Sequence, residues 1–589
     1  MRVLFSYTHF LLYSIYAVRV LGSGPVAVNW SSKSYGPDGP WQAVTVQVGT
    51  DSSGNPLATV DLHPGGLYGS TINTNKLCGN TSTFSQPCLA EPAGLYDPDN
   101  SSSVYQNTTT ASFVIQWLWR GGIAEDEDAS ERNVLDTIRM NSSGGVLTAE
   151  NTTIAAMDVA TLTIPGATYL VEVGHLALGA PGHGTFAYQT GVVGQTFPAS
   201  LAANNVIPSN SFGLHYGSAS LNVPGSLTWG GYDQSRVLGD VGTFNLVNGD
   251  QYNMILSLLD VEIGVETGSS PFNASSFTGL LQLNSSSEQP TNIIPTVPYI
   301  YMAPETCAAI AQHLPVVLSS YTNLYIWNTA DPQFEKIINS PSYLAFVFGT
   351  SGVGNPTIKV PFQLLNLTLD AAIVSPPQQY FPCQPFHASD GSNHYVLGKA
   401  FLQAAFLGMN WDQNKFFVAQ APGPGTAAAN LQPIETTDET ITSNPISDFS
   451  SSWSQNWTPI EASSSSNATG AATTAPASPP STGSGLSSGA KAGIAVGIIV
   501  GVLGLAVALF FFFRRRKSGR VSSGQNPMHK ENDKTSSAFE ISAPLSAPLE
   551  KDGHGINDEI GGDGLSHEIG AGEQLHEMDA LPGMVRRLG

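Results

Sequence analysis

The chain has 589 residues, of which 41% are hydrophobic, and it carries a formal net charge of -22 with an isoelectric point near 4.8. This length is sufficient for two or more domains and a sizeable core. Because no basic region is available to neutralise phosphates, the composition argues against a nucleic-acid partner.

The first 23 residues are similar to a secretory signal peptide. Arg2 precedes an apolar run over Val3–Val18, and small residues follow at Gly22–Gly24. We therefore expect residues 1–23 to be removed and the following part of the chain to enter the secretory pathway.

An early β-hairpin is predicted next. Gln42–Val48 alternates polar and apolar residues, and turn-forming residues over Asp51–Pro56 join it to the apolar, β-branched stretch Leu57–Leu62. We expect that second strand to end in a tight turn at His63–Gly66, since Pro64 and two glycines follow the histidine.

The rest of the chain as far as about residue 421 has the pattern of an all-β protein. Short apolar runs alternate with Gly, Pro, Asn and Ser, and the one helix that the pattern favours is Pro304–Leu314. An even number of cysteines without metal-site spacing predicts two disulfides and no metal site. Three pairings are open, and we favour the sequence-local one, Cys78 with Cys88 and Cys307 with Cys383.

Beyond residue 421 the composition changes. Residues 422–490 are predicted to form an extended Ser/Thr/Pro-rich stalk, because they contain too few apolar residues for a core. Residues 491–513 are uncharged, apolar and long enough to cross a bilayer, and Arg514–Lys517 follows at once. The positive-inside rule then puts the N-terminal bulk outside the cell and the tail, 514–589, in the cytoplasm.

This topology predicts a protein of the plasma membrane or cell surface. Glycines at every fourth position of the span, at Gly493, Gly497 and Gly501, could pack two spans into a homodimer, although glycine is common in such helices. Sequons for N-glycosylation occur only on the predicted outer side. They are Asn29, Asn80, Asn100, Asn107, Asn141, Asn151, Asn273, Asn284, Asn366, Asn456 and Asn467.

Several segments, taken in order, resemble the pepsin-like aspartic proteases, peptidase family A1. They are Trp41–Gly66, the Cys78–Cys88 loop, Gly94–Pro98 with Ser101–Tyr105, Leu135–Ile138, Ser211–Leu214, Gly225–Asp233, and Tyr395–Leu402 with Asn414–Ala419. The resemblance implies a bilobal all-β fold, with an N-terminal lobe at 24–215 and a C-terminal lobe at 216–421. It implies no cofactor.

The catalytic residues of that family do not carry over. Its mechanism resembles acid–base catalysis by two aspartates that share a proton, one from each lobe. In this sequence His63 stands at the first aspartate position and Pro295 at the second, where Pro295-Thr296-Val297 replaces the expected Asp-Thr/Ser-Gly. Asp61 is the nearest carboxylate to the first position, and by strand periodicity it shares a face with His63.

Other side chains could contribute to such a centre. Asp61 and His63 could pair, with Ser70 nearby, but a satisfied turn histidine is the more ordinary interpretation. His175 and His183, on a later strand of the resemblance, are more typical of structural residues. Trp117, Trp119, Tyr299 and Tyr301 are candidates to line the cleft, with an equal expectation that they belong to the core.

The sequence thus favours a membrane-anchored cell-surface glycoprotein with a degenerate, non-proteolytic centre that binds an extended peptide or glycan. It is similar to aspartic-protease-like surface proteins found widely in filamentous fungi. One alternative is an acid endopeptidase in which Asp61 meets a distant carboxylate, such as Asp260 or Asp370. Another is a cell-wall sensor or adhesin that acts through its stalk and tail.

Overall fold

A computed structural model describes residues 24–79, 88–106, 129–164, 167–180, 185–187, 193–247, 254–282, 288–350, 355–386 and 395–461. Strands dominate these residues, and the prediction of an all-β protein is confirmed. Helices are short. They are α1 (Asn75–Gly79), α3 (Phe197–Ala203), α4 (Pro304–Ala311), α5 (Pro332–Asn339), α6 (Lys399–Leu402) and α7 (Phe449–Trp453), with 3-10 turns at η1 (Glu91–Ala93), η2 (Pro98–Asn100) and η4 (Gln234–Arg236).

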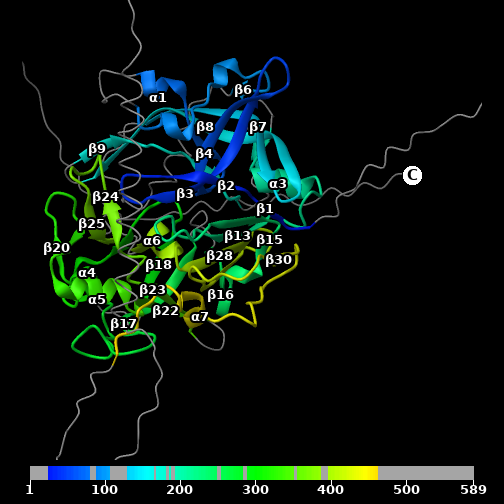
Figure 1. Ribbon diagram of the computed structural model, residues 1–589. Coiled ribbons are helices and arrows are strands. Elements are labelled where there is room, and N and C mark those ends of the chain that lie inside the picture. The colour runs from blue at the N-terminus through cyan, green and yellow to red at the C-terminus, as the bar shows by residue number, and fades with distance from the viewer. Residues whose placement is uncertain are drawn as a thin grey trace, which may run out of the picture. The chain divides into compact units, whose positions relative to one another are not determined.

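The first half of the described chain forms one large sheet, drawn in blue and cyan in Figure 1. Its strands are β2 (Trp30–Tyr35), β3 (Trp41–Thr50), β4 (Pro56–Gly66), β5 (Ser70–Asn73), β6 (Tyr105–Gln106), β7 (Ala129–Ser142), β8 (Gly145–Ile164), β9 (Ala167–Leu170), β10 (His175–Ala177), β11 (Thr185–Ala187) and β12 (Val193–Gln195).

The predicted hairpin is formed by β3 and β4, which pair antiparallel from Thr50↔Pro56 to Val44↔Leu62. The expected tight turn at His63–Gly66 is wrong. Strand β4 runs on through Gly66 because β10 lies beside it in parallel, with His175 opposite His63 and Leu176 opposite Pro64. The missing N–H of Pro64 is tolerated at this irregular end of the strand, where the register shifts.

The second half forms two further sheets, drawn in green in Figure 1. One comprises β17 (Ile255–Val265), β18 (Gln289–Ile293), β19 (Ile300–Met302), β22 (Ser342–Gly349), β23 (Thr357–Pro361), β26 (Cys383–Pro385) and β27 (Tyr395–Leu397). The other comprises β20 (Val316–Leu318), β21 (Tyr325–Trp327), β24 (Leu367–Leu369) and β25 (Gln378–Phe381). The predicted helix is present as α4 and ends at Ala311, three residues before the expected Leu314.

A fourth sheet joins segments from the start, middle and end of the described chain. Its strands, in spatial order, are β1 (Val26–Ala27), β14 (Ser226–Trp229), β13 (Ser211–His215), β28 (Ala405–Asn410), β29 (Lys415–Gln420) and β16 (Leu238–Asn245). The predicted lobe boundary at 215/216 therefore falls inside this sheet, between two hydrogen-bonded strands, and does not separate independent halves.

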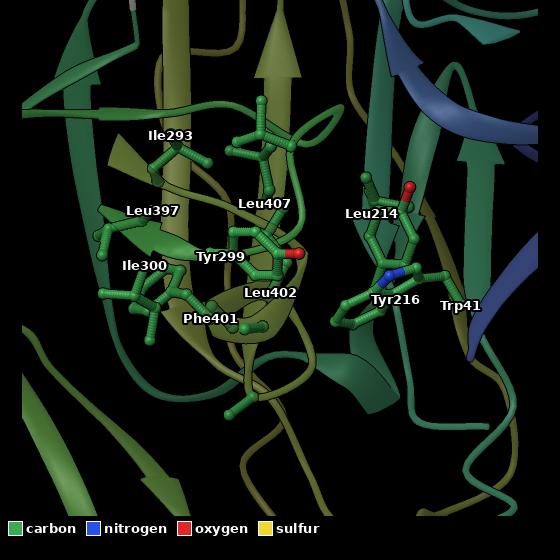
Figure 2. Packing of buried hydrophobic residues seen from close by; sticks show 14 of the residues in the cluster. Trp41, Leu214, Tyr216, Ile293, Tyr299, Ile300, Leu397, Phe401, Leu402 and Leu407 are labelled. Atoms are coloured by element: carbon green, nitrogen blue, oxygen red, sulfur yellow. The ribbon is translucent and has the colours of Figure 1, made fainter. Parts of the chain in front are cut away.

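One continuous apolar core lies under these sheets. It includes Trp41 and Leu214 together with Ile293, Tyr299 and Phe401, so both halves contribute to it. Figure 2 shows Tyr299 among the aliphatic side chains, with its ring facing the side on which Trp41 and Tyr216 lie. The interior is thus shared between the halves rather than divided.

The predicted stalk is wrong over residues 422–461, which pack on the folded domain. Strand β30 (Leu431–Pro433) pairs with β15 (Gly231–Asp233), and Ile434 is fully buried. Further along, α7 and the residues after it bury Trp453 and Trp457, whose rings stack 5.3 Å apart. A few large side chains anchor this segment despite its polar average composition. The remainder of the predicted stalk, 462–490, lies outside the described residues.

Both predicted disulfides are confirmed, Cys78 with Cys88 and Cys307 with Cys383. Among the described residues, no helix has both the length and the apolar character that crossing a bilayer requires. The predicted signal peptide (1–23), span (491–513) and tail (514–589) lie outside those residues.

Candidate functional site

The two segments that carry His63 and Pro295 meet in space. We call His63–Gly66 the first site segment and Pro295–Val297 the second site turn. A Cβ placed on Gly65 would lie 3.0 Å from both the carbonyl carbon and Cβ of Pro295, so only glycine fits this contact without displacing its neighbour. The hydroxyl of Tyr216 donates to the carbonyl of Pro64 at 2.7 Å and lies 3.5 Å from that of Pro295.

Each site segment continues from a strand with a parallel neighbour. Strand β10 runs beside β4, and β27 runs beside β18, with Leu397 opposite Ile293. These neighbours bring two more residues to the site. His175 begins β10, and Lys399 follows β27 after Gly398.

His63 and Lys399 are in direct contact although both are buried, with 5% and 4% of their surfaces exposed. Nζ of Lys399 lies 3.2 Å from Nδ1 of His63. Burial, followed by the charge of Lys399 and then His175, lowers the pKa of His63 well below its usual value, so the ring is neutral. Nδ1 therefore accepts from the ammonium group, and Nε2 carries the ring proton.

Lys399 itself titrates at a lower pH than an ordinary lysine. Burial lowers its pKa to about 8, while the charge of Asp38 acts in the opposite direction. The ammonium also lies 6.0 Å from the centre of the Trp41 ring, within the range of a cation–π contact. At neutral pH the site thus holds a buried positive charge at the place where the sequence resemblance implies an acid.

His175 is a second neutral imidazole at the site. Its ring centre lies 6.1 Å from that of His63, and Nδ1 is 3.5 Å from the hydroxyl of Thr71. Burial, and secondly the charge of Lys399, lowers the pKa of His175 to about 3. The prediction of a structural role fits this packing, but His175 also borders the cavity described next.

A cavity of about 80 Å³ opens beside the first site segment. Aromatic rings, the two imidazoles, Lys399 and two acids that sequence analysis did not select surround it. Those acids are Asp38, which is 6% exposed, and Glu172. Asp38 accepts a hydrogen bond from the indole N–H of Trp41 at 2.7 Å, and Glu172 accepts one from the backbone N–H of Gly36 at 3.2 Å.

Both acids bind protons more tightly than usual. Burial raises the pKa of Asp38, against the opposing effects of Lys399, Trp41 and the Tyr299 hydroxyl. Burial, together with the charges of Asp38 and Asp370, raises the pKa of Glu172 to about 7. Near neutral pH one carboxyl group of this cavity is therefore partly protonated.

Asp61 does not join the cavity. Its carboxylate accepts hydrogen bonds from the hydroxyls of Ser31 at 2.7 Å, Tyr35 at 2.5 Å and Thr45 at 2.5 Å. The suggested Asp61–His63 pair is wrong, because these three hydroxyls hold the carboxylate and His63 contacts Lys399 instead.

The other groups suggested from sequence are also occupied elsewhere. Ser70 is fully buried and accepts from the backbone N–H of Ala177. Asp260 accepts from the backbone N–H groups of Val261 and Gly279. Asp370 is exposed; its charge helps to raise the pKa of Glu172, and its backbone N–H donates to the carbonyl of Pro37.

Among the four aromatic candidates, Tyr299 and Tyr301 border the cavity and also belong to the buried core. Their ring centres lie 5.8 Å apart. Trp117, Trp119 and His183 lie outside the described residues.

No motif in the sequence pointed to Lys399, Asp38 or Glu172 as site residues. For Lys399 a signal existed, since it is the one charged residue in the otherwise apolar run Tyr395–Leu402. Asp38 looks like an ordinary turn residue between Pro37 and Gly39, and no local pattern distinguishes Glu172.

The sequence profile described as "Eukaryotic aspartyl protease" matches residues 75–421, more than half of the chain. The chain belongs to this family. The match includes the second site turn and Lys399 and begins after His63. The profile therefore does not cover His63–Gly66. The assignment of this segment to the first catalytic position of the family rests on its contact with Pro295 and its parallel pairing with β10.

Two fungal relatives are similar over part of the chain. "Acid protease" of Saccharomycopsis fibuligera is 25% identical over 230 residues, 38% of this chain and 50% of that protein. "Aspartic proteinase sxa1" of Schizosaccharomyces pombe is 22% identical over 241 residues, 40% of each. The chain thus spans half or less of these relatives. The solved aspartic proteinase from Irpex lacteus has 15% identity and a TM-score of 0.43, covering 67% of this chain and 97% of that one.

Proposed function

We propose that this family member is a non-proteolytic, membrane-anchored cell-surface glycoprotein that binds an extended peptide or glycan in the cleft between its halves. The observation that carries the proposal is the identity of the residues on the two meeting segments. They are His63 and Pro295, and neither position offers a carboxyl group.

The chemistry of these residues supports binding rather than cleavage. A prolyl side chain neither gives nor takes a proton, and His63 already accepts from Lys399 through Nδ1. Its pKa, held well below the usual value, also makes His63 a poor base near neutral pH. Loss of a general base alone reduces rates by roughly 10² to 10⁴, and groups that act as a unit leave little activity when one is lost.

An acid endopeptidase is the second candidate, and Asp38 with Glu172 is the observation that favours it. The two carboxyl groups border one cavity and both have raised pKa values, so either could serve as a proton donor to a bound substrate. Against it, Lys399 and Trp41 stabilise the ionised form of Asp38 beside the cavity.

The proposed address at the cell surface is supported by the signal-like N-terminus, the apolar run at 491–513 and the sequons. Asn29, Asn100, Asn141, Asn151 and Asn273 are exposed in the folded domain and accessible to a glycosyltransferase. A mobility shift on enzymatic deglycosylation, with retention of the chain in carbonate-washed membranes, tests this part.

The decisive test is cleavage of casein and a peptide library by the purified full-length chain between pH 3 and 6, with and without pepstatin. We expect no more cleavage than with the variant that combines Asp38→Asn and Glu172→Gln. A fungal acid protease run in parallel shows that the assay detects activity. Pepstatin-sensitive cleavage that the double variant lacks would establish the acid endopeptidase instead.

A further inference from the structure

The cavity beside the first site segment is bordered by a buried lysine and a buried aspartate that form no ion pair with each other. Lys399 and Asp38 are 4% and 6% exposed, and the charge of each influences the pKa of the other. Among the ion pairs of the described residues, neither side chain takes part. Buried charges of this kind are normally paired or bound to a ligand, because desolvation strongly disfavours them.

Several neutral polar atoms around the same cavity also lack a partner. Oγ1 of Thr296 and Oε1 of Gln384 are buried and make no hydrogen bond within the described protein. Nε2 of His63 makes none with good geometry, although the backbone of Trp41 lies near the ring. The three residues are 5%, 8% and 9% exposed, and all three border the cavity. The hydroxyl oxygen of Tyr299 is a fourth such atom at this cavity. Other unpartnered polar atoms are spread over the described residues, and the gathering of four around one cavity supports a binding site.

From these contacts we infer that the cavity binds a free α-amino acid with an apolar side chain. The ammonium group of the amino acid faces Asp38, and its carboxylate faces Nζ of Lys399. His63, which donates through Nε2, and the polar atoms of Thr296 and Gln384 supply further hydrogen bonds. A ligand with both charges can pair with Lys399 and with a carboxyl group of the cavity at once, whereas a simple acid, an amine or a sugar can pair with at most one of them.

The residues that line the cavity and its volume indicate which side chain the bound amino acid carries. Trp41, Tyr169 and Tyr301 present aromatic surface to the cavity. A volume of about 80 Å³ is several times the ~10–15 Å³ that one water needs on the same measure, and this is the size range of a small organic molecule. Valine, leucine, methionine and phenylalanine are therefore the best candidates. The inference rests on the non-proteolytic part of the proposed function and goes beyond it, because the free amino acid is a ligand in addition to the extended peptide or glycan.

Isothermal titration calorimetry on the full-length chain with the twenty proteinogenic L-amino acids tests the inference. We expect saturable binding of the apolar ones. Blocking either charge, as in N-acetyl-leucine or leucine methyl ester, should weaken binding by about 10- to 100-fold, the effect of losing one charge-assisted hydrogen bond. Equal binding of the blocked derivatives, or no binding of any free amino acid, would overturn the inference.

Variants supply an independent comparison. Lys399→Met and Asp38→Asn should each weaken leucine binding by a similar factor, whereas Lys336→Met and Asp240→Asn, at exposed positions, should bind as the parent chain does. If a cavity variant fails to fold, the blocked derivatives still decide the question on the unaltered protein. Casein cleavage would refute the proposed function, and the calorimetric titration would still decide whether the cavity binds an amino acid. Failure of every amino acid to bind would refute only this inference.

Discussion

Three histidines in the described chain are buried as neutral rings, and this has a consequence for stability in acid. They are His63, His175 and His215, of which His215 lies far in sequence from the site segments and is fully buried. Burial, followed by the charge of Arg236, lowers the pKa of His215 to about 3. Its Nε2 lies 3.0 Å from the carbonyl of Gln403, to which it donates.

The sign of the pH effect follows from these values. Between the ordinary histidine pKa of ~6.5 and about pH 3, the His215 ring is protonated in the unfolded chain and neutral in the folded chain. Stability therefore falls as the pH falls through that window, by about 2 kcal/mol at pH 5 for His215. Glu172 contributes in the opposite direction, because its raised pKa makes the folded state bind the extra proton between its unfolded pKa and about 7.

We expect His215→Gln to reduce the loss of stability between pH 6.5 and 4 by roughly 1.4 kcal/mol per pH unit, since one proton no longer differs between the two states. Urea unfolding at pH 7, 6, 5 and 4 measures this slope. His313→Gln is the matched control, because His313 is only partly buried and should change the slope less. Parallel slopes for the parent chain and His215→Gln would show that His215 is charged in the folded state.

For single residues, the sequence could predict which side chains occupy the two catalytic positions of the family but not which residues surround them. His63 and Pro295 are found by counting along motifs. The contact between His63 and Lys399 joins residues far apart in the chain. It needs the parallel pairing of β27 with β18 and also the approach of the first site segment to the second site turn. Strand periodicity suggested Asp61 as a partner, and three hydroxyls from β2 and β3 hold it instead.

Among the elements, the segment after residue 421 gives the clearest test of packing. Trp453 is 1% exposed, and its ring stacks on Trp457 and approaches Phe449. We expect Trp453→Ala to destabilise the folded chain by about 3–5 kcal/mol, the usual cost of removing a buried aromatic side chain. Chemical denaturation measures the loss.

Ile446→Ala is the control within the same segment, because Ile446 is 91% exposed. Its effect should stay within about 0.5 kcal/mol. If both substitutions were equally mild, the segment would not contribute to the stability of the domain, and the predicted stalk would regain support.

The elements also show how far sequence patterns reach. Alternating residues predicted β3 and β4 correctly, because one face of that hairpin is buried and register follows from burial. Average composition failed for residues 422–461, where Ile434, Phe449, Trp453 and Trp457 are separated by polar residues. Helix α5 was also missed, although Asp331 caps it and Pro332 begins it, both ordinary helix-start signals.

For the whole molecule, the sheet shared by both halves predicts that the described domain unfolds as one cooperative unit. Strand β13 pairs along its length with β28, from Ser211↔Asn410 to His215↔Phe406, and β1 pairs with β14. Apolar side chains from both halves also share one core. Neither half can lose its structure without exposing that interface, so the free energies of opening should be equal on both sides.

A disulfide confined to the second half allows this coupling to be measured. Cys307–Cys383 closes a loop of 76 residues, and the chain-entropy relation gives it a stabilising effect of about 4–5 kcal/mol. We expect the double variant Cys307→Ser, Cys383→Ser to show a single calorimetric transition with a lower midpoint temperature. Amide exchange followed by mass spectrometry should then show equal loss of protection in β4, from the first half, and β22, from the second. Lost protection in β22 with unchanged protection in β4 would mean that the halves unfold separately, because coupled halves would lose protection together.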